Sequence, residues 1–326
     1  MKSLKHFCFS FLFLNFCLSS FSIAEQLKRN PEVRFGSVQE YRNREALLKG
    51  KSGSSTSTNN PVTKSDLGLQ RPVETKNKGF GYHFGFESKL LHSNNPGSSP
   101  SAEVDSAGIW ENSLSNNFLL GAYDFGGASF SPILGLGLSN SSYFGDDTLD
   151  ALDSNNLNLS FVGIFQFSKG WSVRGGLSSS FDFNPDMQQT YRQTSPSIGL
   201  SKGFNIAAAS AFVDLSFSYH ITDTDDPTDP DKMDRFESAL LFGVDIPMHN
   251  FEISPYLRFC LANYGNQDRD EFTTNAGIDV SYHFYDWLAL KFLLSYSNRN
   301  ANGADGAAAD FSRFDFGGAI SLNAQF

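Results

Sequence analysis

The chain has 326 residues, of which 40% are hydrophobic, and phenylalanine alone accounts for 33. So much phenylalanine beside so little other apolar mass disfavours an ordinary soluble core and is typical of a β-barrel in which alternate residues face lipid. The net charge of -10 disfavours a nucleic-acid partner, and a mature chain with Cys260 as its one cysteine excludes internal disulfides and cysteine-based metal sites.

The first 24 residues have the three parts of a secretory signal peptide. Lys2 and Lys5 give a positive start, an apolar stretch runs from Phe7 to Leu18, and Ser22-Ile23-Ala24 forms a small-x-small cleavage site. The apolar stretch is too short for a membrane-spanning helix of roughly 20 residues. We therefore predict export with cleavage after residue 24.

Residues 25–78 are basic, with 11 Lys/Arg against 6 Asp/Glu, whereas residues 79–326 carry 12 against 29. A capping box at Ser37 to Glu40 predicts a short helix over 38–49 that ends at Gly50. The rest, rich in Ser, Thr, Asn and Lys, has the composition of a linker. The segment is predicted to be a flexible periplasmic extension; an alternative is that it enters the acidic barrel as a plug.

From Gly79 onward the hydrophobic period is two, as in strands with one apolar and one polar face. Phe272 to Phe284 and Leu288 to Tyr296 show it, and the last strand shows it best, with Phe314, Phe316, Ile320, Leu322 and Phe326 on one parity. Twelve such segments begin near Gly79, Leu114, Ala128, Asn156, Trp171, Pro196, Ile206, Phe236, Phe251, Phe272, Trp287 and Phe314. The second and sixth are the least regular, so ten or fourteen strands also fit the pattern.

The connections between these segments alternate in length. Short turns are predicted near 126–127, 168–170, 203–205, 249–250 and 285–286, and long polar loops at 93–109, 142–154, 183–193, 222–235, 264–271 and 299–312. Outer-membrane barrels have this arrangement of short periplasmic turns and long external loops. Lipid cannot satisfy the hydrogen bonds of an open sheet edge, so the barrel must be closed. We predict an all-β, up-and-down antiparallel transmembrane barrel over residues 79–326.

Aromatic residues gather at both ends of the predicted strands. Phe167, Trp171 and Trp287 flank short turns, while Tyr143, Tyr219 and Tyr264 flank long loops. Two such girdles are favoured at the two membrane interfaces.

The final strand, ending Ala324-Gln325-Phe326, resembles the closing strand of Gram-negative outer-membrane β-barrel proteins. The stretch Tyr296 to Arg299 through Asp310 to Arg313 also resembles the last hairpin of β-barrel porins. The resemblance implies a location in the outer membrane, among lipid and lipopolysaccharide. It also implies that Ile320, Leu322, Ala324 and Phe326 are a signal for the barrel assembly machinery.

Strand parity assigns twelve charged residues to the inner face of the barrel. Eight are acidic and four are basic: Glu87, Lys89, Arg174, Asp182, Asp214, Glu237, Asp245, Glu252, Arg258, Asp279, Lys291 and Asp315. An acidic lining favours cations over anions, but these charges could also pair across strands and fill a narrow interior.

The external loop at 222–235 is the most acidic. Asp223, Asp225, Asp226, Asp229 and Asp231 offer oxygen ligands of the kind that divalent cations prefer, without the spacing of an EF-hand. The simpler interpretation is a solvated loop. No cofactor is expected.

The first functional hypothesis is a narrow, mildly cation-preferring porin or channel for small solutes. The second is a non-conducting barrel that displays acidic, cation-binding loops at the cell surface. A lipid hydrolase comes third, because His92 alone has outward parity among the barrel histidines considered and no serine lies two residues away. No enzymatic activity is therefore expected.

Overall fold

The computed structural model describes residues 79–98, 106–145, 147–223, 233–265, 267–303 and 309–326. Twelve long strands form in chain order: β1 (Gly81–Ser93), β2 (Ala107–Leu119), β4 (Ala128–Phe144), β5 (Ser154–Phe167), β6 (Trp171–Phe183), β7 (Gln189–Ile206), β8 (Ala209–Thr222), β9 (Arg235–Met248), β10 (Phe251–Tyr264), β11 (Asp270–Tyr285), β12 (Leu288–Asn302) and β13 (Phe311–Gln325). The short strand β3 (Tyr123–Phe125) and the 3-10 helices η1 (Asp147–Leu152) and η2 (Ser168–Gly170) complete the described elements. The predicted signal peptide and the predicted extension over 25–78 lie outside the described residues.

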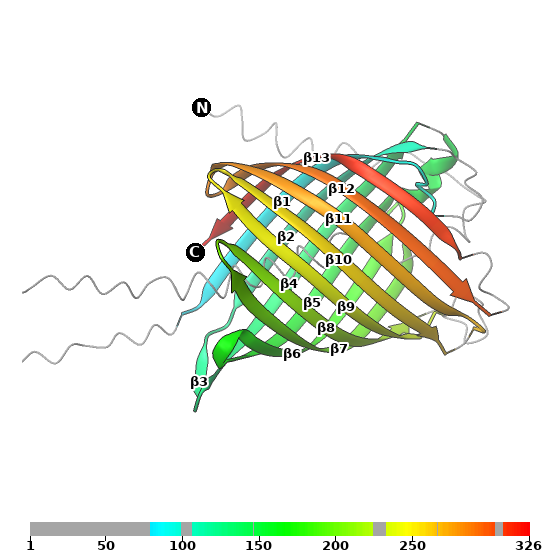
Figure 1. Ribbon diagram of the computed structural model, residues 1–326. Helices are drawn as coiled ribbons and strands as arrows, with labels where there is room; N and C mark the ends of the chain where they lie inside the picture. The colour runs from blue at the N-terminus through cyan, green and yellow to red at the C-terminus, as the bar shows by residue number, and fades with distance from the viewer. Residues whose placement is uncertain (1–78, 99–105, 146, 224–232, 266, 304–308) are drawn as a thin grey trace, which may run out of the picture.

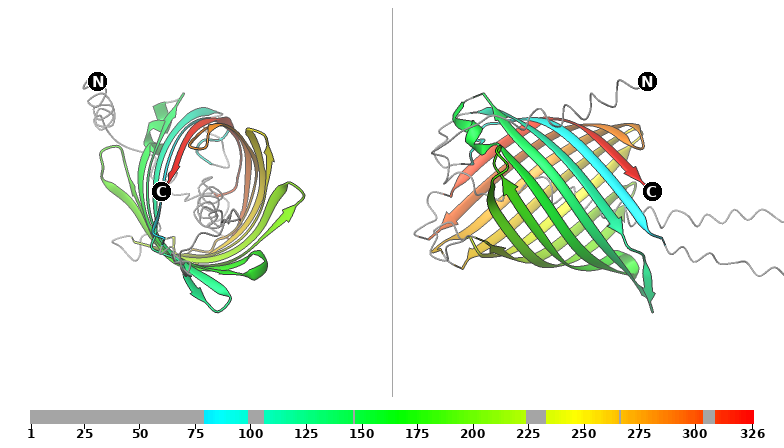
Figure 2. Two further views of the ribbon diagram at one scale, coloured as in Figure 1. Left: turned by 90° about the vertical axis from the view of Figure 1, so that its left-hand side faces the viewer. Right: turned by 180° about the vertical axis from the view of Figure 1, so that it is seen from behind.

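The long strands form a closed ring (Figures 1 and 2). Each pairs antiparallel with its neighbour in sequence, β2 pairs with β4, and β1 pairs with β13 to close the barrel. β3 pairs with the start of β4 and extends one hairpin beyond the ring. The predicted all-β, up-and-down barrel of twelve strands is confirmed. Among the described residues, no helix is long and apolar enough to cross a membrane.

The outer surface of the barrel is apolar. Leu90, Ile198 and Leu261 are 56%, 57% and 58% exposed, and large apolar side chains on every long strand are similarly uncovered. Exposing this much apolar surface to water would be costly, whereas closing the ring satisfies the strand hydrogen bonds internally. The barrel is therefore an outer-membrane barrel whose outer face contacts lipid.

The closing seam joins the two ends of the described chain. β1 and β13 pair from His83 with Gln325 to Ser93 with Asp315. Two further backbone hydrogen bonds join Tyr82 and Phe326, at 3.0 and 2.9 Å, and their rings stack with centroids 6.0 Å apart. The C-terminal residue is thus part of the ladder that closes the barrel.

Three boundaries differ from those that the sequence pattern predicted. β2 begins at Ala107 rather than near Leu114, and β7 begins at Gln189 rather than near Pro196. The extra residues of β7, from Gln189 to Ser195, are mostly polar on both faces, whereas in β2 Ile109 is buried on the inner face and the next residue, Trp110, is exposed on the outer face. In both strands the ladder continues where the hydrophobic alternation does not. The turn expected at 203–205 lies at 207–208, where Ala207 has a φ of 54°.

The two aromatic girdles include two residues that the structure places elsewhere. Phe167, Trp171, Trp287 and Tyr219 are exposed on the outer face. Tyr143 instead packs against an inner apolar cluster, and Tyr264 is buried on the inner face. Both have inner-face parity in their strands, so proximity to a loop was not enough to predict an interfacial position.

Candidate functional site

The inner face of the barrel carries the charged side chains that strand parity predicts to point inward. In β1, for example, His83, Lys89 and Leu91 are buried while Leu90 and His92 are exposed. All twelve charged residues predicted for the inner face have the parity of the more buried positions in their strands. The structure therefore gathers charged residues from eight strands, β1, β6 and β8 to β13, into one lining.

In the half nearer the short turns, two ion pairs each reach across an intervening strand. Lys291 Nζ lies 2.5 Å from Glu87 Oε2, with β13 between them. Arg174 on β6 contacts Asp214 on β8 through both terminal nitrogens, and Nη2 to Oδ1 is 2.7 Å. Between them on β7 is Gly199, where a Cβ would lie 2.5 Å from Arg174 Cζ. Glycine thus leaves the space through which the guanidinium crosses the strand in this position.

An acidic patch, defined as Asp245, Glu252 and Asp279, surrounds Ser254 in the same half. Ser254 Oγ lies 2.7 Å from Asp245 Oδ1 and 3.4 Å from Glu252 Oε1, and Asp279 is the cross-strand partner of Ser254. Three carboxylates on three adjacent strands give this part of the lining a negative potential.

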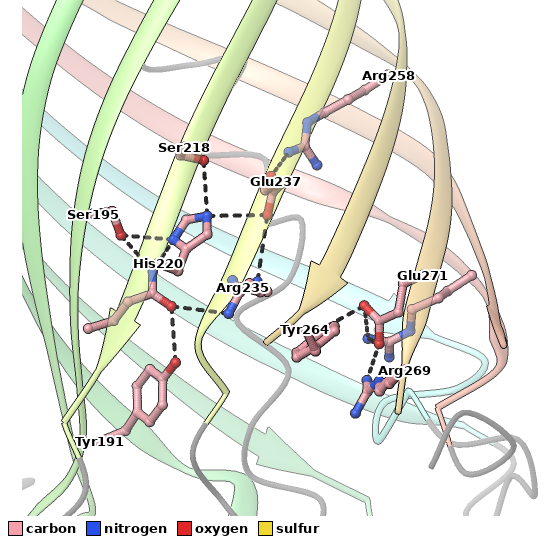
Figure 3. Close-up of polar contacts among 12 residues, drawn as sticks. Tyr191, Ser195, Ser218, His220, Arg235, Glu237, Arg258, Tyr264, Arg269 and Glu271 are labelled. Atoms are coloured by element: carbon pink, nitrogen blue, oxygen red, sulfur yellow. Dashed lines mark hydrogen bonds and ion pairs between the residues drawn. The ribbon is translucent and has the colours of Figure 1, made fainter. Parts of the chain in front are cut away.

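Near the long loops, Glu237 on β9 is the centre of a second cluster (Figure 3). Arg258 Nη2 donates to Glu237 Oε1 at 2.7 Å, Arg235 Nε lies 3.8 Å from Oε2, and His220 Nε2 lies 3.4 Å from Oε2. Ser195 and Ser218 hydroxyls lie 2.8 and 3.0 Å from the two ring nitrogens of His220. One carboxylate thus serves two guanidinium groups and orients a histidine.

A third cluster, centred on Glu271, lies beside it. Arg299 Nη1 lies 3.4 Å from Glu271 Oε1, Arg269 pairs with the same carboxylate, and the Tyr264 hydroxyl donates to Oε2 at 3.1 Å. The Tyr264 ring has Arg235 and Arg269 guanidinium carbons at 5.9 and 4.8 Å from its centroid. Tyr264 therefore links the clusters of Glu237 and Glu271 through cation–π contacts (Figure 3).

The other predicted inner residues also have polar partners. Lys89 pairs with Glu111, Asn156 Nδ2 donates to Asp182 Oδ1 at 2.5 Å, and Arg313 Nε donates to Asp315 Oδ2 at 2.8 Å. Paired charges of this kind hold an inner wall in one arrangement.

Sequence reasoning missed six charged residues of this lining, five near the loop ends of strands and Arg269 directly before β11: Glu111, Arg235, Arg269, Glu271, Arg299 and Arg313. Four of the six are arginines. With them, the described lining holds ten carboxylates and eight basic side chains. The loop half is therefore rich in arginine and the short-turn half is acidic. A signal was available, because the five that lie in strands have inner parity and Arg269 continues the inner parity of β11, but the fading hydrophobic alternation predicts loops at these positions.

The proposed divalent-cation ligands fall mostly outside the described residues. Of the five, only Asp223 is described; its carboxylate accepts a hydrogen bond from Arg192 at 3.1 Å. Across the described ranges, no group of three or more potential metal ligands is found. Asp234 at the other end of the same loop accepts hydrogen bonds from Thr222 N and Oγ1, at 2.7 and 3.0 Å.

Asp153, in the connection between η1 and β5, is a partly buried carboxyl. Burial raises its pKa above the ordinary value, the hydrogen bond from Tyr143 N at 2.7 Å acts in the opposite direction, and the neighbouring Asp150 raises it further. Asp153 therefore fastens the end of β4 as a hydrogen-bond acceptor.

His92, the candidate for lipid hydrolysis, is exposed on the outer face. Its ring lies against Phe316, with centroids 5.1 Å apart, and its cross-strand partners are Gly108 and Phe316. Neither supplies the hydroxyl that a nucleophilic mechanism needs.

Comparison with known proteins yields similarity at the level of three-dimensional structure only. No protein-family model matches the sequence, and no curated protein matches it. Among solved structures, an outer membrane channel from Pseudomonas putida F1 has 11% identity and a TM-score of 0.46, covering 78% of this chain and 100% of that one. The NanC porin has 10% identity and a TM-score of 0.41, covering 75% and 99%, and the β domain of the Bordetella autotransporter BrkA has 11% and 0.39, covering 74% and 98%. Identities and TM-scores as low as these do not support an argument about this protein. Its assignment as an outer-membrane barrel therefore depends on the closed ring of strands and on the apolar outer surface.

The pair of Arg174 and Asp214 offers a direct test of the lining. Changing Asp214→Asn removes the charge that compensates a largely buried guanidinium, so we expect a loss of about 2 kcal/mol in the free energy of unfolding. Urea unfolding of the refolded protein in lipid vesicles, followed by tryptophan fluorescence, measures it. Asp124→Asn on the exposed strand β3 is the matched control, and equal effects at both sites would contradict a structural role for the pair.

Proposed function

We propose that the protein is a narrow outer-membrane channel for small solutes. The proposal is supported above all by the charged side chains that eight or more strands place on the inner face of a twelve-strand barrel that is apolar outside. Eight-strand barrels are filled by their side chains, and sixteen-strand porins leave a wide aqueous pore. Twelve strands with paired charges on the inner face favour passage of small solutes only.

The finer part of the proposal is a mild preference for cations. Ten carboxylates against eight basic groups in the described lining favour cations by a small margin. The acidic patch of Asp245, Glu252 and Asp279 favours them in the short-turn half. The arginines around Glu237 and Glu271 oppose this preference near the loops, so the expected selectivity is weaker than the sequence alone suggested.

Planar-bilayer recordings of the purified, refolded full chain test both parts. We expect small, discrete conductance steps and, across a potassium chloride gradient, a reversal potential displaced modestly toward that of potassium. A membrane that stays silent at every voltage would remove the channel proposal. Conductance with a reversal potential toward chloride would remove only the cation preference.

The C-terminal aromatic residue is proposed to act in assembly rather than in stability. Phe326 is 79% exposed and its backbone carries the closing hydrogen bonds, which Phe326→Ala retains. We expect several-fold less heat-modifiable barrel in the outer membrane of cells, with less than about 1 kcal/mol change in the unfolding free energy of refolded protein. Phe314→Ala, on the same strand and also exposed, is the control. Normal assembly of the Phe326→Ala variant in cells would refute the assembly role.

A further inference from the structure

The inner wall of the barrel holds apolar as well as charged side chains. Leu91, Ile109, Leu293 and Ala319 form one buried inner cluster, and Leu119, Ile133, Val162 and Ile164 form another. Phe212 and Leu241 form a third, against which Tyr256 packs. The ten buried members of these clusters have inner parity, and each is at most 6% exposed. Packing against one another removes these groups from water, and the clusters give the inner wall apolar areas against which further apolar side chains can pack.

The width of the barrel decides whether a segment of chain fits inside it. Twelve strands about 4.8 Å apart, tilted by about 40°, enclose a ring about 24 Å across between backbones. Inward side chains do not fill such a ring, and a segment of chain about 10 Å wide fits inside it. The interior of the barrel therefore has room for a segment of chain between the side chains of its walls.

Polar groups on the same wall point to an occupant as well. Asn275 on β11 is 1% exposed, and neither its Oδ1 nor its Nδ2 has a hydrogen-bond partner among the described residues. Buried amides almost always have partners. Four residues further along the same strand and on the same face is Asp279 of the acidic patch. The wall thus presents unsatisfied amide atoms beside three carboxylates.

We propose that residues 25–78 of this chain seat inside the barrel, against the acidic patch and the inner apolar clusters. The segment carries 11 Lys/Arg and 6 Asp/Glu, so its charge is complementary to that of Asp245, Glu252 and Asp279. It joins β1 at the short-turn end, the half of the barrel in which the patch lies. Lys76 and Lys78 are within three residues of Gly79 and so lie within about 11 Å of that opening. The predicted helix over 38–49 brings Val38, Tyr41 and Leu48 as apolar side chains for the clusters.

The protease sensitivity of the intact chain in lipid vesicles tests whether residues 25–78 lie inside the barrel. Trypsin cleaves after Lys and Arg except before Pro, so a free tether with ten such sites, Arg71 before Pro72 being the exception, is removed quickly. We expect residues 25–78 to be cut at least tenfold more slowly than in the urea-unfolded chain. The triple variant Asp245→Asn, Glu252→Gln, Asp279→Asn should lose most of this protection. The matched control, Asp147→Asn with Asp150→Asn on the exposed helix η1, should keep it. Rapid cleavage of the natural chain would overturn the proposal.

Cys260 provides a second, positional readout, because it is the one cysteine of the mature chain and is buried on the inner face. With copper phenanthroline added to take up the two electrons that the two thiols release, single cysteines placed at positions 41, 48, 56 and 62 should include at least one that forms a disulfide with Cys260, seen as a shifted band on a non-reducing gel. In the control pair, Cys260→Ser with Leu261→Cys moves the thiol to the outer face, where Leu261 is 58% exposed, and no disulfide should form. Equal cross-linking to the inner-face thiol at position 260 and the outer-face thiol at position 261 would overturn the proposal that residues 25–78 lie inside the barrel.

The consequence for transport rests on the proposed channel. A seated segment narrows the pore, so the disulfide-locked protein should conduct less than the same protein after reduction. A locked protein that conducts as well as the reduced one would show that the segment does not lie in the conducting path. If neither the disulfide-locked nor the reduced protein conducts while residues 25–78 stay protected from trypsin, the channel proposal fails. The proposal that these residues lie inside the barrel is then still supported.

Discussion

The variant Glu237→Gln is expected to lose about 3 kcal/mol of unfolding free energy and to shift ion selectivity toward anions. Glu237 is the shared partner of Arg235, Arg258 and His220, and Arg235 is only 4% exposed. Replacing the carboxylate with a neutral amide leaves two guanidinium groups without their counter-charge, and breaking a buried pair in this way costs about 3–5 kcal/mol. We expect the lower end of this range of free energies because the side chain of Glu237 is 18% exposed and so partly open to solvent.

The same change alters the field near the loop end of the barrel. One elementary charge acts on an ion about 7 Å away with about 0.6 kcal/mol in water, which is about a threefold change in local ion concentration. The ratio of potassium to chloride permeability, measured from reversal potentials, should therefore fall by at least about threefold. Asp223→Asn is the control, because it makes the same chemical change in the exposed pair with Arg192 and should cost less than about 1 kcal/mol. If Glu237→Gln unfolds like the natural protein, the cluster around Glu237 does not stabilise the barrel.

The second large effect is expected at the closing seam, for Gly317→Ala. A Cβ at Gly317 would lie 2.0 Å from the backbone oxygen of Leu90 and 2.8 Å from Leu91 Cα. Because both atoms belong to the backbone of β1, the clash is relieved only if β1 and β13 separate. Overpacking costs typically 1–3 kcal/mol, and separation also weakens the ladder that closes the barrel, so we expect a loss of about 3 kcal/mol.

The adjacent glycine gives a closely matched comparison. At Gly318 the nearest atom to an added Cβ is Lys291 O at 3.5 Å, an ordinary contact. Gly318→Ala should therefore change the unfolding free energy by less than about 1 kcal/mol. The measurement is urea unfolding in lipid vesicles, together with the temperature at which the gel mobility changes from folded to unfolded. Equal destabilisation by the two alanines would mean that the close approach at Gly317 does not limit closure.

The sequence by itself determined the barrel, because its signals are local and repeated. Alternation of apolar and polar residues specifies which face of each strand meets lipid, and alternation of short and long connections specifies the up-and-down order. Closure then follows from the hydrogen-bonding requirement of strands in lipid. Parity also assigned Glu87, Asp214, Glu237 and Lys291 to the inner face.

Only the tertiary structure decided which inner residues meet. The pairing of Arg174 with Asp214 depends on strand register and on a glycine between them, and neither is encoded in the spacing of the two residues. The arginines at the loop ends were missed because hydrophobic alternation fades where strands leave the membrane, although the hydrogen-bonded ladder continues. Tyr264 was placed at the membrane interface for the same reason, since residue type near a strand end does not reveal the face. The closed ring, rather than any one strand, determines which charges are compensated. It therefore also determines whether the lining favours cations or anions.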